Sequence, residues 1–222
     1  MSPTRRNFMQ QSLAVAATLP AALAAAEQAP ATKPWLEAGD LVAKMNWLNP
    51  PASVTYGAGT VTAKTRGHTD FWRKTFYGYI TDNGHFFHLP MFGEFVFQAR
   101  IGGEYTSLYD QAGIMVRLDE KHWMKCGTEL VDGKRRASSV FTHEFSDWST
   151  LDDVSQTDAA WWRVARRKDS IEAQVSADGV AFYTVRQGYF PPYVEAKVGL
   201  MCASPEGAGF EATFDQLKLE KP

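Results

Sequence analysis

The sequence has few cysteines, little excess charge and, beyond its first 26 residues, no apolar run of the length that a membrane helix needs. Its 222 residues include two Cys, five His, 23 Lys or Arg and 25 Asp or Glu. Proteins that bind DNA or RNA normally carry a basic stripe or a strongly positive domain charge. We therefore expect no nucleic-acid partner and no membrane span in the mature chain.

The first 26 residues have the pattern of an export signal. Arg5 and Arg6 precede an uncharged stretch that begins at Ser12 and ends in small residues at Ala26. This stretch is shorter than the roughly 20 apolar residues of a spanning helix. The pattern predicts a twin-arginine signal peptide over residues 1–26, and with it a periplasmic or secreted protein.

Composition divides the rest of the chain into a spacer and one domain. Residues 27–39 begin with alanine, proline and polar residues that cannot bury enough apolar surface to fold alone. Residues 40–222 are too few for two ordinary domains and enough for one large β-sandwich. We expect the spacer to end at residue 39 and the domain to begin at residue 40.

Short segments rich in Val, Ile, Phe, Tyr and Trp alternate with turn residues at intervals of about ten residues, which is typical of antiparallel sandwiches. The predicted strands are 53–56, 60–64, 85–88, 94–101, 112–118, 122–131, 137–144, 161–167, 170–176, 180–186, 196–203 and 209–219. Turn residues predict hairpins at 82–84, 132–133 and 178–179. No helical stripe of ten residues follows residue 26, so we expect only one-turn helices. The fold class is an all-β jelly-roll sandwich of two antiparallel sheets.

Two neighbouring runs, 109–118 and 123–133, contain most of the charged, amide and aromatic side chains that could bind a ligand. Side chains alternate between the faces of a strand, so Ile114 and Val116 share one face with Met124 and Cys126 if the runs form a hairpin over residues 119–121. The opposite face then displays Arg117, Trp123, Lys125 and Glu129, with Asp110 and Gln111 at its entrance. We expect that face to be open to solvent and to hold a ligand.

The chemistry of these residues suits a sugar. A sugar offers C–H faces to aromatic rings and hydroxyls to charged or amide groups. The predicted ligand-binding residues are Trp72, Arg73, Tyr109, Asp110, Gln111, Arg117, Trp123, Lys125, Glu129, Asp147 and Trp148. The alternative for this set is ordinary sandwich packing, with Arg117 and Glu129 as a cross-strand ion pair. The sequence thus predicts a glycan or another small polar ligand and no cofactor.

Several segments together carry a resemblance to a known family. They are Asp70–Thr75, Tyr109–Gly113, Trp123–Glu129, Phe145–Trp148, Tyr189–Pro192 and Met201–Pro205. By these segments the chain, over roughly residues 40–220, is identified as a member of the domain of unknown function 1349 family, which includes fungal proteins named as regulators of enolase. The resemblance implies a concanavalin-A-like fold, in which many relatives hold ligand on a concave sheet face, and it implies no established activity.

Two enzymatic alternatives and a structural one stay open. A glycoside hydrolase needs two carboxylates about 5 to 9.5 Å apart, for which Glu129 could combine with Asp147 or Asp110. A polysaccharide lyase could use Tyr109, His143 and Arg117. A non-catalytic structural or regulatory accessory domain needs none of them.

The histidines and cysteines favour no metal site and no disulfide. His85 and His88 are three residues apart and point to opposite faces of a strand, so we expect no metal there. Cys126 and Cys202 lie on different predicted strands, and we expect two buried free thiols.

Overall fold

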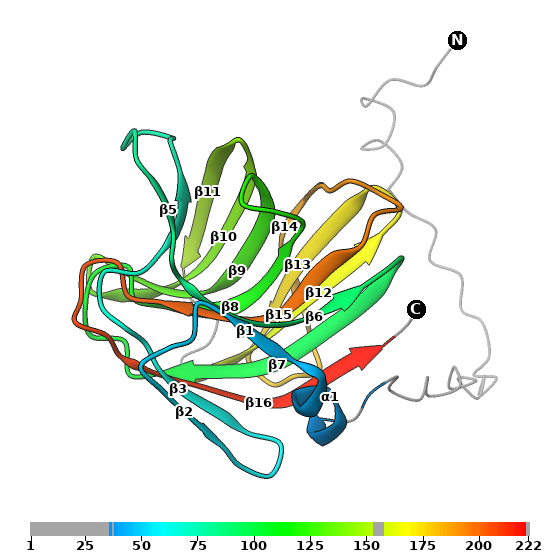
Figure 1. The fold of residues 1–222 in the computed structure, drawn as a ribbon, viewed down its shortest axis with the longest axis horizontal. Helices are drawn as coiled ribbons and strands as arrows, with labels where there is room; N and C mark the ends of the chain where they lie inside the picture. The colour runs from blue at the N-terminus through cyan, green and yellow to red at the C-terminus, as the bar shows by residue number, and fades with distance from the viewer. Residues whose placement is uncertain (1–35, 37, 153–157, 221–222) are drawn as a thin grey trace, which may run out of the picture. The chain divides into compact units, whose positions relative to one another are not determined.

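The computed structural model describes Leu36, residues 38–152 and residues 158–220 (Figure 1). This part of the chain consists almost entirely of antiparallel strands that form two seven-stranded sheets and one small hairpin. The predicted all-β, concanavalin-A-like sandwich is confirmed. The predicted signal peptide, residues 1–26, lies outside the described residues.

The first sheet contains most of the predicted ligand-binding residues. Its strands, in spatial order, are β1 (Asn46–Leu48), β6 (His85–Met91), β15 (Ala196–Ala203), β8 (Gln111–Arg117), β9 (His122–Val131), β10 (Lys134–His143) and β11 (Phe145–Asp152). The strands β8 and β9 pair from Gln111 opposite Glu129 to Arg117 opposite Trp123. The hairpin predicted over residues 119–121 is therefore confirmed.

The second sheet packs against the first. Its order is β14 (Tyr183–Tyr189), β13 (Ser170–Ser176), β12 (Ala159–Arg167), β7 (Phe95–Gly103), β16 (Glu211–Glu220), β3 (Val61–Lys64) and β2 (Ser53–Tyr56). The main core lies between the sheets, where Ile114 and Val116 of β8 meet Trp162 and Val164 of β12 in one apolar cluster. Figure 1 shows the two layers, with β8 and β9 in the upper one and β7 and β16 below.

A two-stranded sheet stands outside this sandwich. It consists of β4 (Phe71–Arg73) and β5 (Ile80–Asp82), which we name the β4–β5 hairpin. Its turn contains Lys74 and Phe76, both with positive φ although neither is glycine. Because such residues carry no turn signal, this hairpin was absent from the predicted strands.

Other predictions differ from the structure in detail. The turn predicted at 82–84 is no hairpin, because β5 belongs to the small sheet and β6 to the first sheet. The Phe71 ring packs directly against Gly84, because a Cβ on this residue would lie 2.5 Å from the ring. Helix α1 (Ala38–Lys44) is longer than one turn and begins inside the predicted spacer, where it buries Leu41. The strands β1 and β11 are not among the predicted strands.

Candidate functional site

The β4–β5 hairpin covers the outer face of the first sheet, the face turned away from the main core. Phe71 and Trp72 pack there with Met115, Trp123 and other residues in a second apolar cluster, separate from the main core. The Ser146 hydroxyl also accepts a hydrogen bond from the Arg73 amide at 2.9 Å. The hairpin is thereby held against β8, β9 and β11.

The predicted alternation of side chains along β8 and β9 is correct. Ile114, Val116, Met124 and Cys126 belong to the main core, whereas Met115 and Trp123 belong to the outer cluster. The expectation that the outer face is open to solvent is wrong. Arg117 is 6% exposed, Lys125 4% and Glu129 7%, because the β4–β5 hairpin lies over them.

Arg117 and Trp123 hold the hairpin in place. The Arg117 guanidinium donates to both carboxylate oxygens of Asp82 in β5, at 2.6 and 2.8 Å. It also lies 5.7 Å from the centre of the Phe71 ring, and that ring meets Trp123 edge to face. The predicted ligand contacts of Arg117 and Trp123 are thus replaced by contacts within the protein.

A cavity of about 130 Å³ lies between the hairpin and the outer face. Its walls are aromatic and its floor is polar. It is lined by Asp70, Trp72, Tyr77, Tyr79, Tyr109, Gln111, Lys125, Glu129, Val140, Trp148, Pro205 and Glu206. We call it the aromatic cavity, and it brings together six of the predicted site residues: Trp72, Tyr109, Gln111, Lys125, Glu129 and Trp148.

The floor of the aromatic cavity contains one fixed ion pair and one carboxyl group without such a partner. The Lys125 ammonium donates to Asp70 Oδ1 at 3.0 Å and to the Phe71 carbonyl at 2.8 Å. Glu129 accepts a hydrogen bond from the Trp148 indole at 3.0 Å. Burial raises the pKa of Glu129, while the charge of Lys125 and the hydrogen bonds oppose this shift.

The rim of the aromatic cavity is closed by a contact between two tyrosines. The Tyr77 hydroxyl, on the turn of the hairpin, lies 3.5 Å from the Tyr109 hydroxyl, just before β8. This hydrogen bond, together with partial burial, raises the pKa of Tyr109 to about 12. On each side a second ring supports the pair, since Tyr77 stacks on Tyr79 and Tyr109 meets Trp148 edge to face.

A second hollow of about 610 Å³ adjoins the aromatic cavity and shares Trp72, Tyr77 and Trp148 with it. We call it the neighbouring groove. It adds Phe76, which is 93% exposed, and Phe145, which is 59% exposed. Asp147 also lines this groove, although its carboxylate pairs with Arg186 at 2.7 Å.

Two further predicted residues have structural partners. Asp110 is fully buried and accepts hydrogen bonds from the amides of Thr106 and Ser107, which fixes the loop before β8. Arg73 lies 3.5 Å from Glu144. Neither lines the aromatic cavity.

The residues proposed for the enzymatic alternatives are dispersed. Neither Asp147 nor Asp110 lines the aromatic cavity, so neither lies there with Glu129. His143 Nε2 lies 3.2 Å from the Tyr189 carbonyl, and Arg117 is bound to Asp82. The predicted lyase set of Tyr109, His143 and Arg117 is therefore not assembled.

Sequence reasoning missed Asp70, Tyr77, Tyr79, Val140, Pro205 and Glu206 among the cavity residues. The signal for Asp70 was present, because it begins the first segment on which the family resemblance rests. Tyr77 and Tyr79 lie in the turn of the β4–β5 hairpin, which the sequence pattern does not predict. Pro205 and Glu206 follow β15, and only the fold brings them to the rim.

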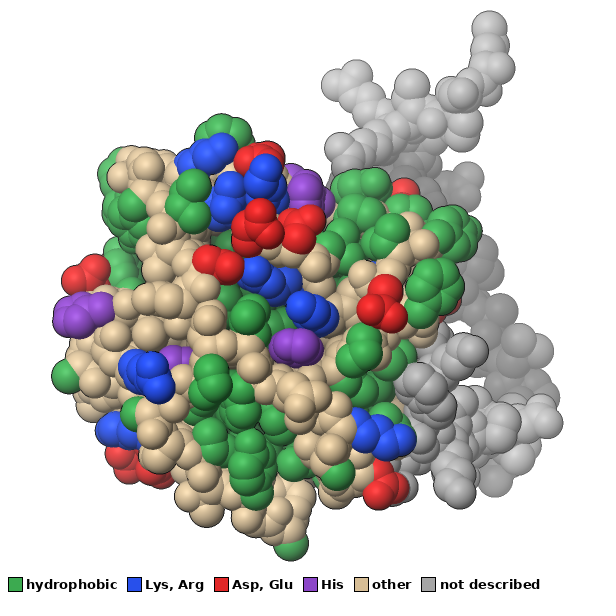
Figure 2. Space-filling view, in the orientation of Figure 1, with side chains coloured by type: hydrophobic (Ala, Val, Ile, Leu, Met, Phe, Trp, Pro, Cys, Tyr) green, Lys and Arg blue, Asp and Glu red, His purple; other side chains and the backbone are tan. Residues whose placement is uncertain are grey.

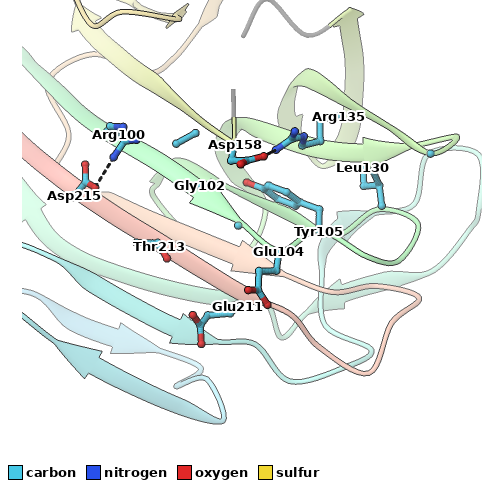
Figure 3. A pocket seen from close by; sticks show the side chains of 13 residues that line it. Arg100, Gly102, Glu104, Tyr105, Leu130, Arg135, Asp158, Glu211, Thr213 and Asp215 are labelled. Atoms are coloured by element: carbon cyan, nitrogen blue, oxygen red, sulfur yellow. Dashed lines mark hydrogen bonds and ion pairs between the residues drawn. The ribbon is translucent and has the colours of Figure 1, made fainter. Parts of the chain in front are cut away.

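A larger hollow of about 720 Å³ lies beside β7 and β16 of the second sheet. Figure 3 shows four of its charged side chains joined in pairs, Arg100 with Asp215 and Arg135 with Asp158, each at 3.0 Å. Each of these pairs is neutral, the remaining charged residues of the lining are the acids Glu104 and Glu211, and the one aromatic ring among the lining residues is that of Tyr105. This hollow offers less for a ligand than the aromatic cavity does.

Two other expectations concern cysteine and charge. Cys126 and Cys202 are free and buried, as predicted, and burial raises the pKa of both thiols. Among the residues that the structure describes, no three His, Cys, Asp or Glu side chains gather as a metal site. On the face in Figure 2, basic and acidic side chains lie next to one another.

These features define a class: an antiparallel β-sandwich whose outer sheet face carries a hairpin-covered aromatic cavity. The family model described as a protein of unknown function, DUF1349, matches residues 47–222. The chain therefore belongs to the DUF1349 family, as the sequence segments predicted. A curated relative from Saccharomyces cerevisiae, "Regulation of enolase protein 1", is 45% identical over 176 residues, which cover 79% of this chain and 89% of the relative.

Solved structures agree with this assignment. A functionally unknown protein from Saccharomyces cerevisiae superposes with a TM-score of 0.79 at 44% identity, over 82% of this chain and 98% of that one. A glycoside hydrolase family 43 protein from Bacillus licheniformis superposes with a TM-score of 0.65 at 11% identity, over 81% of this chain and 37% of that one. The second likeness shows the fold alone.

The predicted localisation is wrong by these comparisons. The relatives are yeast proteins, one of them named for the regulation of enolase, which contradicts a cargo of a bacterial twin-arginine pathway. Paired arginines before an apolar stretch form a short pattern that is not specific enough to decide a compartment. Within the described ranges, no helix is long and apolar enough to cross a membrane.

Proposed function

We propose that this chain binds a carbohydrate, with one sugar unit in the aromatic cavity. The observation that carries the proposal is the combination of aromatic walls, including Tyr79 and Trp148, with a floor that contains Gln111, Lys125 and Glu129. Ligand sites are commonly hollows with mostly apolar walls and a few polar groups that fix orientation. The cavity is small, at about 130 Å³, which favours a single ring over a larger ligand.

Both parts of the cavity match the two chemistries of a sugar. Aromatic rings pack against the C–H face of a pyranose, and an indole or phenol can do so while its polar end stays hydrogen-bonded. The Gln111 amide and the Glu129 carboxyl can exchange hydrogen bonds with hydroxyl groups. Lys125 is already bound to Asp70 and Phe71, so its role is to hold the floor in position.

The neighbouring groove supports an extended ligand. It continues from the aromatic cavity across Trp72, Tyr77 and Trp148, and exposes the rings of Phe76 and Phe145. A sugar chain with its terminal unit in the cavity would lay its next unit on these rings. We therefore expect an oligosaccharide to bind more tightly than the monosaccharide at its end.

One observation favours hydrolysis as a second candidate. Glu129 has a raised pKa in a buried site, and the charge of Asp70 contributes to the shift. A buried carboxyl group with a raised pKa near a second carboxylate is the arrangement of a glycosidase acid and its partner. In that case Glu129 would donate a proton to the leaving oxygen, and Asp70 would be the second carboxylate.

A glycan array, followed by reducing-end assays on the oligosaccharides that bind, tests these candidates. Binding without turnover supports the proposal, and turnover that Glu129→Gln abolishes supports hydrolysis. If the array shows no binding and the reducing-end assays show no turnover, both functions are contradicted and a structural or regulatory accessory domain is favoured. The variant Asp152→Asn serves as a control, because Asp152 is an exposed acid at the end of β11 that pairs only at the surface with Arg136.

A further inference from the structure

Acidic groups outnumber basic groups in the aromatic cavity. Asp70, Glu129 and Glu206 line it together with the single ammonium of Lys125. That ammonium lies 3.0 Å from Asp70, so this pair is already neutral. Two carboxyl groups remain, one buried at the floor and one exposed at the rim.

The environment of Glu129 has room for a positive charge. Its hydrogen bonds come from neutral groups, the Trp148 indole and the Ser138 hydroxyl. Within the described residues, no salt bridge joins Glu129 to a basic side chain. A buried carboxyl group without an ion-pair partner is costly in its charged form, and a cationic ligand would remove that cost.

The aromatic walls are an independent observation that points the same way. Trp72, Tyr77, Tyr79, Tyr109 and Trp148 surround a cavity of about 130 Å³. Ring faces attract ammonium groups, and cages of several aromatic residues are used to recognise them. A neutral sugar would use the rings and could hydrogen-bond to Glu129, but it would leave the two remaining carboxyl groups without a positive charge beside them.

We propose that the ligand unit in the aromatic cavity carries an ammonium group, and that an amino sugar is bound with this group between Glu129 and the aromatic rings. The proposal rests on the sugar-binding function proposed above and names the class of sugar. The bound ammonium would form a charge-assisted hydrogen bond with Glu129 and would be attracted to the carboxylate of Glu206 at the rim.

Binding of an ammonium should be linked to protons. A cation favours the ionised form of Glu129, so a protonated Glu129 must release its proton when the ligand enters. Affinity should therefore rise with pH until Glu129 is ionised in the free protein. The other titratable groups facing the cavity are Asp70, Tyr77, Tyr79, Tyr109, Lys125 and Glu206.

Titration calorimetry with four probes tests the proposal: glucosamine, N-acetylglucosamine, glucose and tetramethylammonium. We expect glucosamine to bind about tenfold or more tightly than the two neutral sugars. Glu129→Gln should remove this preference. Glu206→Gln, at an exposed position on the rim, should weaken it to a smaller degree. Asp152→Asn, remote from the cavity, should leave it unchanged.

The remaining outcomes separate the two proposals. Equal affinity for glucosamine and glucose would overturn the ammonium proposal and leave carbohydrate binding standing. If tetramethylammonium binds and none of the sugars does, the cavity recognises a cation, and the proposed carbohydrate binding is contradicted. Failure of both cationic probes to bind at millimolar concentration would overturn the ammonium proposal.

Discussion

The two faces of the first sheet are both buried at β8 and β9, but in different ways. The inner face packs on the second sheet through apolar side chains such as Ile114 and Val116. The outer face is covered by the β4–β5 hairpin and mixes apolar residues with Arg117, Lys125 and Glu129. Charged groups are rarely this buried unless they are paired, and here the pairs with Asp82 and Asp70 attach the hairpin to the sheet.

This difference separates stability from function within a single strand pair. The inner face has close packing and few polar groups, such as Thr128, whose hydroxyl accepts a hydrogen bond from the Trp162 indole at 3.4 Å, so its residues determine the fold. The outer face retains a cavity of about 130 Å³ and a buried carboxyl group. A protein keeps such features at a cost in stability, which is why they indicate a binding site.

The sharpest test of the comparison uses two neighbouring residues of β8. Ile114 and Met115 are both fully buried, one on the inner face and the other on the outer face. We expect Ile114→Ala to cost about 3 to 5 kcal/mol and Met115→Ala about 2 to 3 kcal/mol, because a two-stranded hairpin can shift to fill space and a seven-stranded sheet cannot. Urea unfolding measures both values. A larger loss for Met115→Ala would contradict the comparison.

The attachment of the hairpin gives the next largest effect. Asp82→Asn leaves the Arg117 guanidinium buried without its carboxylate, and we expect a loss of about 1.5 to 3 kcal/mol in the free energy of unfolding. Asp152→Asn breaks a surface ion pair with Arg136 and should cost less than about 1 kcal/mol. Equal losses in the two variants would show that the Arg117 pair does not hold the hairpin.

The smallest effect is a pH dependence that comes from Glu129. Burial raises the pKa of this group in the folded protein above its value in the unfolded chain. The folded state therefore binds the proton more tightly. The resulting stability is fully present below the unfolded pKa of about 4.3 and is lost as the pH rises through the raised pKa of the folded protein. The variant Glu129→Gln has no carboxyl group at this position, so its stability does not decrease with rising pH for this reason.

Unfolding of wild type and Glu129→Gln at a series of pH values between 4 and 8 measures the dependence. The difference in unfolding free energy should shift in favour of the variant as the pH rises. All other titrating groups are shared by the two proteins, so their contributions cancel to first order. A difference that is constant with pH, or that shifts toward wild type, would contradict the raised pKa.

The sequence was sufficient for much of the sandwich. Alternation along β8 and β9 predicted which side chains face the core, and the Asp132-Gly133 turn between β9 and β10 has the positive φ angles that such residues favour. The strand bounds 122–131, 170–176 and 196–203 match the structure. These features depend on local pattern, which a sequence displays directly.

The site was less accessible to such reasoning because it depends on contacts between distant segments. In the sequence, Arg117 and Glu129 resemble surface residues. The structure buries both, Arg117 against Asp82 of the hairpin and Glu129 beneath Trp148 of β11. That hairpin turns at Lys74 and Phe76, residues that rarely adopt positive φ. Six of the predicted site residues nevertheless line the aromatic cavity, because strand alternation places Lys125 and Glu129 on the correct face.

The central claim is that the aromatic cavity binds sugar, and the most direct measurement compares two tyrosines. Tyr79 is 47% exposed at the cavity, and Tyr183 is 63% exposed on β14 of the other sheet. For the sugar that binds best on the array, calorimetry should show a dissociation constant raised about two- to tenfold by Tyr79→Ala and unchanged by Tyr183→Ala. Equal affinities for wild type and both variants would contradict the claim.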